Sequence, residues 1–91
     1  MSSKKVKKAK AHAKEELDER TLNSMIQNVR KRRHDLALTQ TQASLDGGLE
    51  PQYFTAFENG LRRNPTLVTL NKMAKGLKTT MAALVTMPGS S

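Results

Sequence analysis

The side chains of this sequence that could do chemistry are mainly cationic. Lysine and arginine number 16 and aspartate and glutamate number 8, so the formal net charge at pH 7 is +8. Such a positive balance attracts polyanions, and nucleic acid is the partner that it favours. The charge alone leaves open simple solubility, or attraction to an RNA or membrane surface.

Residue types for covalent or metal chemistry are scarce. There is no cysteine, which excludes disulfides, thiolate zinc sites and thiol nucleophiles and fits a reducing cytoplasm. His12 and His34 share no ligand spacing with each other or with a carboxylate pair, so no metal site is expected. No glycine-rich phosphate loop and no Ser-His-Asp arrangement is visible. We therefore expect neither an enzyme nor a cofactor.

The three aromatic residues, Tyr53, Phe54 and Phe57, lie close together in one segment. Proteins that bind single strands without sequence preference need exposed aromatic rings on which bases stack. Three rings in one helix cannot form that platform and also fill a core, so binding to a duplex is favoured. Phe54 and Phe57 are expected in the core.

The ends of the chain differ in composition from its middle. Residues 1–14 contain six lysines and only one strongly apolar residue, Val6, so they bury too little surface to offset the entropy of ordering them. We expect a disordered basic arm there, one domain over residues 15–86 and a flexible tail over residues 87–91. No apolar run approaches the ~18 residues that a membrane span needs, and a cytoplasmic location is expected.

The middle of the chain begins with the pattern of two helices. Apolar residues recur every three or four positions over residues 22–36, which predicts a first helix. Thr39 offers a hydroxyl to cap a second helix over about residues 40–46. Gly47 and Gly48 end that helix, because glycine adopts the positive φ that turns require.

Three further helices follow in the pattern. An acidic cap at Glu50, with proline at position 51, starts a third helix that ends at residues 59–60. Pro65 and Thr66 begin a fourth helix, which is expected to be buried through Leu67, Leu70, Met73, Ala74 and Leu77. Thr80 caps a short fifth helix that holds Met81, Leu84 and Val85. Five short helices with brief connections and no strand pattern predict a compact all-α domain.

The segment TQTQASLDGGLEPQYFTAFENGLRRNP, residues 39–65, resembles the Cro/C1-type helix-turn-helix family of phage repressors and bacterial regulators. The matching features are a glutamine that starts the second helix, a turn glycine, an E-N-G end to the third helix, and Asn-Pro after a basic loop: Gln40, Gly48, Glu58-Asn59-Gly60 and Asn64-Pro65. The resemblance covers roughly residues 25–86. It implies a five-helix, lambda-repressor-like domain whose third helix, about residues 50–59, enters the major groove of duplex DNA.

The resemblance assigns base contacts to the start of the third helix. Gln52 matches a base-contacting position, and its amide can donate and accept at once, as the reading of adenine requires. Ala56 is small enough to touch a thymine methyl, or simply leaves room for the groove wall. Tyr53 is a lesser candidate, since its hydroxyl could reach DNA or its ring could pack at the edge of the core.

Phosphate contacts are assigned to two places. Gln40 starts a helix, where free backbone N–H groups favour a phosphate. Asn59, Arg62 and Arg63 match the segment with which the family holds the DNA backbone, and such contacts position a protein without specifying sequence. The alternatives are that Gln40 is only a surface residue and that the two arginines form only a solvated surface.

One expected contact is structural. Arg33 matches an arginine that pairs, in this family, with the glutamate of E-N-G. The resemblance therefore implies a largely shielded ion pair between Arg33 and Glu58 that ties the first helix to the recognition helix.

The sequence departs from the family pattern at several positions. Ala43 and Gly47 stand where larger apolar residues are common, which predicts a thinly packed second helix. Glu50 stands where a polar contact to DNA is common; we expect an N-cap, with acceptance from a cytosine amino group as the alternative. Strong sequence specificity is therefore in doubt. Lys78 replaces a glycine that usually ends a helix, so fraying is expected there.

Together these features predict a homodimeric transcriptional regulator that binds a two-fold operator and is nucleoid-associated when bound to double-stranded DNA. The expected dimer surface is formed by Met81, Leu84 and Val85, and the basic arm adds salt-sensitive affinity. A phage repressor, a restriction–modification controller and an antitoxin stay open. The rival hypothesis is a protein-interaction module, an antitoxin or bridging factor whose main partner is a protein such as a toxin.

Overall fold

The computed structural model describes residues 17–86, so the arm expected over residues 1–14 and the tail expected over residues 87–91 lie outside it. The described residues form five helices and no strand. The helices are α1 (Glu19–Asp35), α2 (Gln40–Asp46), α3 (Tyr53–Glu58), α4 (Leu67–Gly76) and α5 (Met81–Val85). The predicted all-α, five-helix domain is confirmed. None of these helices is long and apolar enough to cross a membrane.

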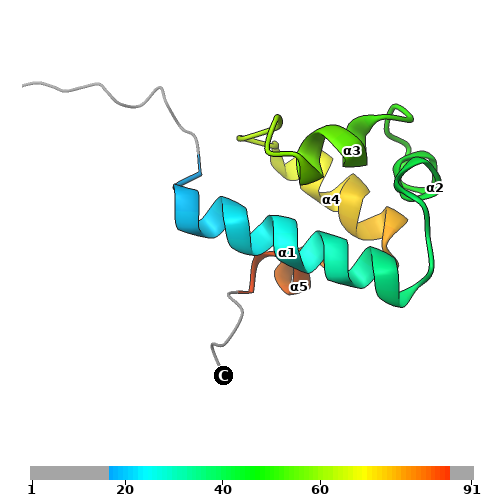
Figure 1. Cartoon of the computed structure of the whole chain (residues 1–91), viewed down its shortest axis with the longest axis horizontal. Coiled ribbons are helices and arrows are strands. Elements are labelled where there is room, and N and C mark those ends of the chain that lie inside the picture. Colours follow the sequence, from blue (N-terminus) through cyan, green and yellow to red (C-terminus); the bar gives the residue numbers. More distant parts are fainter. Residues whose placement is uncertain (1–16, 87–91) are drawn as a thin grey trace, which may run out of the picture.

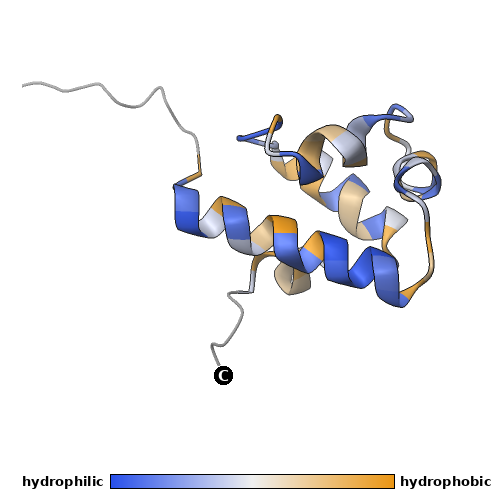
Figure 2. Ribbon diagram, viewed as in Figure 1, coloured by the Kyte–Doolittle hydropathy of each residue, from blue (hydrophilic) through white to orange (hydrophobic). Residues whose placement is uncertain are grey.

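The longest helix, α1, lies between α5 and the other three helices (Figure 1). In that view α2, α3 and α4 lie above α1, and α5 lies below it. α1 packs against α3 and α5, α2 packs against α3 and α4, and α4 packs against α5. Orange and blue residues alternate along α1 in Figure 2, as expected for a helix with one buried side. The shared core consists of Leu22, Met25, Val29, Ala43, Phe54, Phe57, Leu70, Met73, Ala74, Leu77 and Leu84.

Side-chain caps determine where four of the helices begin. Asp18 accepts a hydrogen bond of 2.8 Å from the backbone N–H three residues on, so α1 begins earlier than its apolar pattern predicted. Thr39 caps α2 as predicted, and it also forms a reciprocal capping box with Gln42. Thr66 and Thr80 cap α4 and α5. These boundaries therefore follow from local sequence.

Four helices end in a residue with positive φ. Gly48 and Gly60, each at φ 79°, end α2 and α3 as predicted. Ala37 and Lys78, at φ 56° and 55°, occupy the same position after α1 and α4, where a side chain costs about 1–2 kcal/mol relative to glycine. Lys78 therefore holds the backbone conformation of the glycine that it replaces.

Two expectations about burial are wrong. Leu67 is 73% exposed, at the first position of α4. Leu84 is 1% exposed and belongs to the core, because α5 packs that residue against α1 and α4. Of the residues expected at a dimer surface, only Val85 is exposed, since Met81 is partly buried.

α2 and α4 approach each other closely at small residues. A Cβ placed on Gly47 would overlap the carbonyl oxygen of Lys72, and one placed on Gly76 would overlap the carbonyl oxygen of Ala43. Ala43 is fully buried at this contact. The prediction of a thinly packed second helix is therefore wrong, because small side chains here bring two backbones into contact.

Candidate nucleic-acid interface

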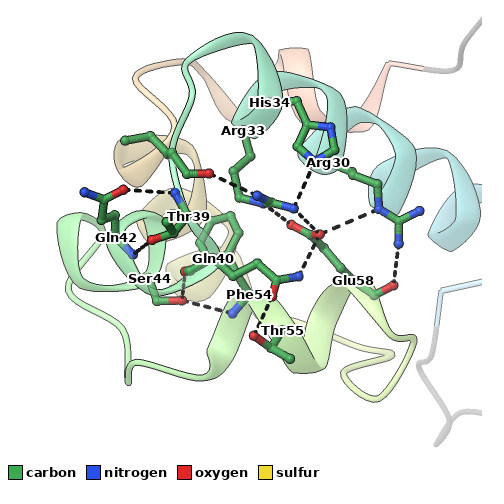
Figure 3. A network of polar contacts seen from close by, with 11 residues as sticks. Arg30, Arg33, His34, Thr39, Gln40, Gln42, Ser44, Phe54, Thr55 and Glu58 are labelled. Carbon is green, nitrogen blue, oxygen red and sulfur yellow. Dashed lines mark hydrogen bonds and ion pairs between the residues drawn. The ribbon is translucent and has the colours of Figure 1, made fainter.

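One buried hydroxyl joins the two helices of the helix-turn-helix unit. Ser44 Oγ donates to the carbonyl oxygen of Gln40 at 2.8 Å and accepts from the backbone N–H of Phe54 at 3.0 Å (Figure 3). Phe54 is the second residue of α3, so its N–H has no partner within that helix. Ser44 thus fixes the start of α3 against α2. Sequence analysis did not identify Ser44. The only indication in the sequence is that Ser44 directly follows Ala43, which is buried.

The turn that leads into α3 differs from the prediction. α3 begins at Tyr53, and its N-cap Gln52 makes no side-chain capping bond. Glu50 contributes to this turn through its backbone. Its carbonyl oxygen accepts a hydrogen bond of 3.0 Å from the N–H of Tyr53, and Pro51 lies between the two residues. The prediction of Glu50 as a side-chain N-cap is therefore wrong, because a β-turn with proline at its second position delays the helix.

The inner side of α3 holds a buried carboxylate. Arg33 donates to both carboxylate oxygens of Glu58, from Nε to Oε2 at 2.7 Å and from Nη2 to Oε1 at 2.9 Å. The side chains are 11% and 1% exposed, respectively. The ion pair implied by the resemblance is thus formed, with the bidentate geometry that arginine favours. Arg30 adds a longer contact, from Nε to Oε1 at 3.6 Å.

The charge of Glu58 is stabilised by these neighbours. Burial alone would raise the pKa of this carboxyl group, but hydrogen bonds from Arg33 and Gln40, with the charges of Arg33 and Arg30, outweigh burial. The pKa of Glu58 is therefore lowered from its ordinary value. Removing one partner of a fully buried pair leaves the other charge unpaired, which typically costs ~3–5 kcal/mol.

Gln40 is engaged inside the domain. Its Nε2 donates to Glu58 Oε1 at 3.0 Å, and its Oε1 accepts from Thr55 Oγ1 at 2.9 Å (Figure 3). The side chain expected to reach a phosphate therefore also links α2 to α3. Sequence analysis missed Thr55, because nothing in the sequence shows which side of α3 faces Gln40.

A further arginine supports the scaffold. Arg32 donates from Nε to the carbonyl oxygen of Leu77 at 2.9 Å and from Nη2 to that of Lys78 at 2.8 Å. These carbonyls lie at the C-terminal end of α4, where a cation also complements the helix dipole. Arg32 and Arg33 of α1 thus make contacts within the domain, whereas Lys31 is exposed to solvent.

The outer side of α3 and the loop after it present polar groups to solvent. Gln52 and Asn59 are exposed at the two ends of α3, and Ala56 is half-buried between them. Arg62 and Arg63 follow in the loop, the first exposed and the second half-buried. This outer surface, from Gln52 to Arg63, contains every residue that sequence analysis assigned to DNA contact except Gln40.

The two loop arginines are held by different neighbours. The guanidinium of Arg62 lies 5.7 Å from the centre of the Tyr53 ring, which stacks on Phe57 at 6.4 Å. Arg63 Nη2 lies 2.7 Å from Glu19 Oε1 at the start of α1. Burial raises the pKa of Tyr53, and the charge of Arg62 opposes that effect. Among residues 17–86, no cluster of His, Asp and Glu side chains is placed to hold a metal ion.

Comparison with known proteins agrees with this geometry. Residues 29–84 match the sequence profile of the helix-turn-helix family. An uncharacterised HTH-type transcriptional regulator of Sinorhizobium fredii is 37% identical over 59 residues, which are 65% of this chain and 75% of that protein.

Solved structures give the same fold. A hypothetical transcription factor from Neisseria superimposes with a TM-score of 0.70 at 27% identity, over 81% of this chain and 85% of that one. The restriction-modification controller protein C.AhdI from Aeromonas hydrophila superimposes with a TM-score of 0.63 at 30% identity, over 69% of this chain and 94% of the controller. The chain belongs to the Cro/C1-type helix-turn-helix family of transcriptional regulators.

Proposed function

We propose that this protein is a non-enzymatic transcriptional regulator that binds double-stranded DNA sequence-specifically through α3 and the loop after it. The observation that carries the proposal is the division of α3 into two sides. Phe54, Phe57 and Glu58 are buried in the domain, whereas Gln52 and Asn59 are exposed. A helix supported in this way can enter a major groove without disturbing its own contacts. Family membership supports the same function.

Base reading belongs to the first turns of α3. Gln52 is exposed at the start of the helix, and Ala56 follows one turn later on the same side. An amide that donates and accepts suits adenine, and a small apolar side chain suits a thymine methyl. Tyr53 is the lesser candidate, because its ring already contacts Arg62 and Phe57.

Phosphate contacts belong to the flanks of α3. Arg62 and Asn59 are exposed beside it, and Arg63 is reachable once it leaves Glu19. Gln40 uses one hydrogen of its amide nitrogen on Glu58, and the other hydrogen remains for a phosphate. These four residues would position the protein, while α3 selects the sequence.

We further propose that the protein acts as a homodimer through the exposed side of α5. That helix has no charged residue, and Ala82 and Val85 are exposed on it, so a second copy can approach closely. Two-fold symmetry would place two recognition helices one helical turn of DNA apart, about 34–36 Å. Sedimentation velocity of Val85→Asp tests this surface: dimers should become monomers, whereas the control Leu45→Asp on α2 should remain dimeric.

Titration of duplexes selected from a random library tests the DNA-binding function. We expect enrichment of a two-fold sequence that binds about a thousandfold tighter than random duplex. The logarithm of its binding constant should fall linearly with the logarithm of salt concentration. Equal affinity for every duplex, or no binding, would contradict the proposal.

A single substitution tests the reading residue. Gln52→Ala should reduce discrimination at one base pair by about 1–3 kcal/mol, with little change in affinity for random duplex. The control Asn71→Ala removes an exposed amide from α4 and should leave both affinities unchanged. A loss that is the same on all sequences would assign Gln52 to a phosphate instead of a base.

One observation favours the second candidate, a protein-interaction module. Leu61, Leu67 and Val68 are large apolar residues that are all more than 60% exposed, and exposed apolar residues that form one continuous patch mark protein-interaction surfaces. A regulator whose main partner is protein would bind every duplex with similar weak affinity. The selection experiment above therefore separates the two functions.

A further inference from the structure

The loop after α3 contains an arginine that is already paired within the molecule. Arg63 Nη2 lies 2.7 Å from Glu19 Oε1, although 44 positions separate the two residues in sequence. Resting on the proposed function, we propose that Glu19 sets the affinity for duplex DNA by competing with the phosphates for Arg63. Glu19 is not itself expected to contact DNA. In the absence of DNA, its carboxylate would occupy the place at Arg63 that a phosphate takes in the complex.

The exposure of both partners makes the exchange physically accessible. The Arg63 side chain is 39% exposed and the Glu19 side chain 69% exposed. A phosphate can therefore approach the guanidinium from solvent while the carboxylate returns to water. No buried contact has to break, in contrast to Arg33, whose side chain is only 11% exposed.

The negative charge of Glu19 remains stabilised after Arg63 leaves the carboxylate. It is the first residue of α1, where a negative charge interacts favourably with the positive end of the helix dipole. The exchange thus costs the protein only the exposed ion pair. Pairs of this kind are weak enough that a phosphate can displace the carboxylate.

The neighbouring residue Arg62 has a different kind of partner from Arg63. Arg62 lies over the face of Tyr53, an uncharged partner that leaves the full positive charge available to DNA. Arg63 instead gives up a carboxylate before it gains a phosphate. We therefore expect Arg63 to contribute less to affinity than Arg62, and to contribute more when Glu19 is neutralised.

Fluorescence anisotropy with a random-sequence duplex tests the proposal, because phosphate contacts are independent of sequence. Glu19→Gln should raise the affinity about 1.4- to 5-fold at low salt, the range that corresponds to an exposed ion pair. The matched control is Asp35→Asn, which breaks the exposed Lys31–Asp35 pair of 3.0 Å on the same helix. It removes the same charge away from the loop and should raise the affinity less.

A double-mutant cycle decides whether the gain passes through Arg63. With Arg63→Gln in place, Glu19→Gln should produce only the small gain of the Asp35→Asn control. Thermal melting of each variant verifies that the fold is retained. The proposal is overturned by an unchanged or lower affinity of Glu19→Gln, or by a gain that persists undiminished without Arg63. If the wild-type protein binds no duplex, the proposed function itself fails, and that result is distinct from the others.

Discussion

Two arginine–carboxylate pairs join α1 to α3 and to the loop after it, and they differ strongly in burial. Arg33–Glu58 and Arg63–Glu19 have the same shortest N–O distance of 2.7 Å. The carboxylate of Glu58 is 1% exposed, whereas that of Glu19 is 69% exposed. The comparison indicates that solvent access decides whether such a pair fixes the structure or can be exchanged for a ligand.

The same division holds for the regions around the two pairs. On the inner side, Ser44 and Gln40 join the buried carboxylate in holding α3 in one orientation. On the outer side, Gln52, Asn59 and Arg62 are exposed to solvent.

Neutralising the buried carboxylate should have the largest effect on stability. Glu58→Gln leaves Arg33 without a charged partner, and we expect a loss of about 3–5 kcal/mol in the free energy of unfolding, measured by urea denaturation. The matched control Glu19→Gln breaks the exposed pair and should cost less than about 1 kcal/mol. Equal losses in the two variants would show that burial does not determine how much each ion pair contributes to the free energy of unfolding.

A methyl group between α2 and α4 should have the next largest effect. Alanine normally stabilises a helix interior by about 1 kcal/mol relative to glycine, but at Gly76 it would overlap the carbonyl oxygen of Ala43. Gly76→Ala should therefore destabilise the domain by about 1–3 kcal/mol. The neighbouring exposed substitution Lys75→Ala should stay within about 0.5 kcal/mol. A more stable Gly76→Ala would mean that the helices can move apart.

Acidic pH should reduce the stability that the buried Glu58 carboxylate contributes to the fold. Because the folded pKa of Glu58 is lowered, its contribution to stability is present above the ordinary glutamate pKa of about 4.3 and is lost as pH falls through the folded value. Thermal melts of the wild type should therefore decline more steeply below about pH 4 than those of Glu58→Gln. Parallel pH profiles would contradict the lowered pKa.

The smallest expected effect concerns the outer region. Tyr53→Leu removes the ring beneath Arg62 and should lower duplex affinity about 2- to 5-fold, as a lost cation–π contact would. Tyr53→Phe keeps the ring and should bind as the wild type does. If the phenylalanine variant loses as much affinity as the leucine variant, the hydroxyl is what contacts DNA.

The helix boundaries could largely be predicted because they depend on neighbouring residues. Thr39, Gly48 and Gly60 act within a few positions of themselves, and the structure uses each as expected. Glu50 is the exception, since a proline turn displaced the helix start by two residues. The Arg33–Glu58 pair spans 25 positions, and only the family resemblance indicated it.

The contacts that were missed depend on how the helices cross. Ser44, Thr55 and Gly76 meet partners on other helices, and no local pattern identifies those partners. Leu84 was misplaced for the same reason, because five residues do not reveal which side of a helix is covered. The candidate DNA residues were predicted from the resemblance, and their contacts with DNA stay predictions.

The most direct test of the proposal that α3 packs on one side and binds DNA on the other is chemical-shift mapping of the amide spectrum during titration with a short duplex. We expect the largest changes at residues 52–63, with smaller changes at the start of α2 and at Glu19, and none on the exposed side of α1 beyond its first turn. Changes concentrated on α5 or on the outer side of α1, with residues 52–63 unaffected, would contradict the account.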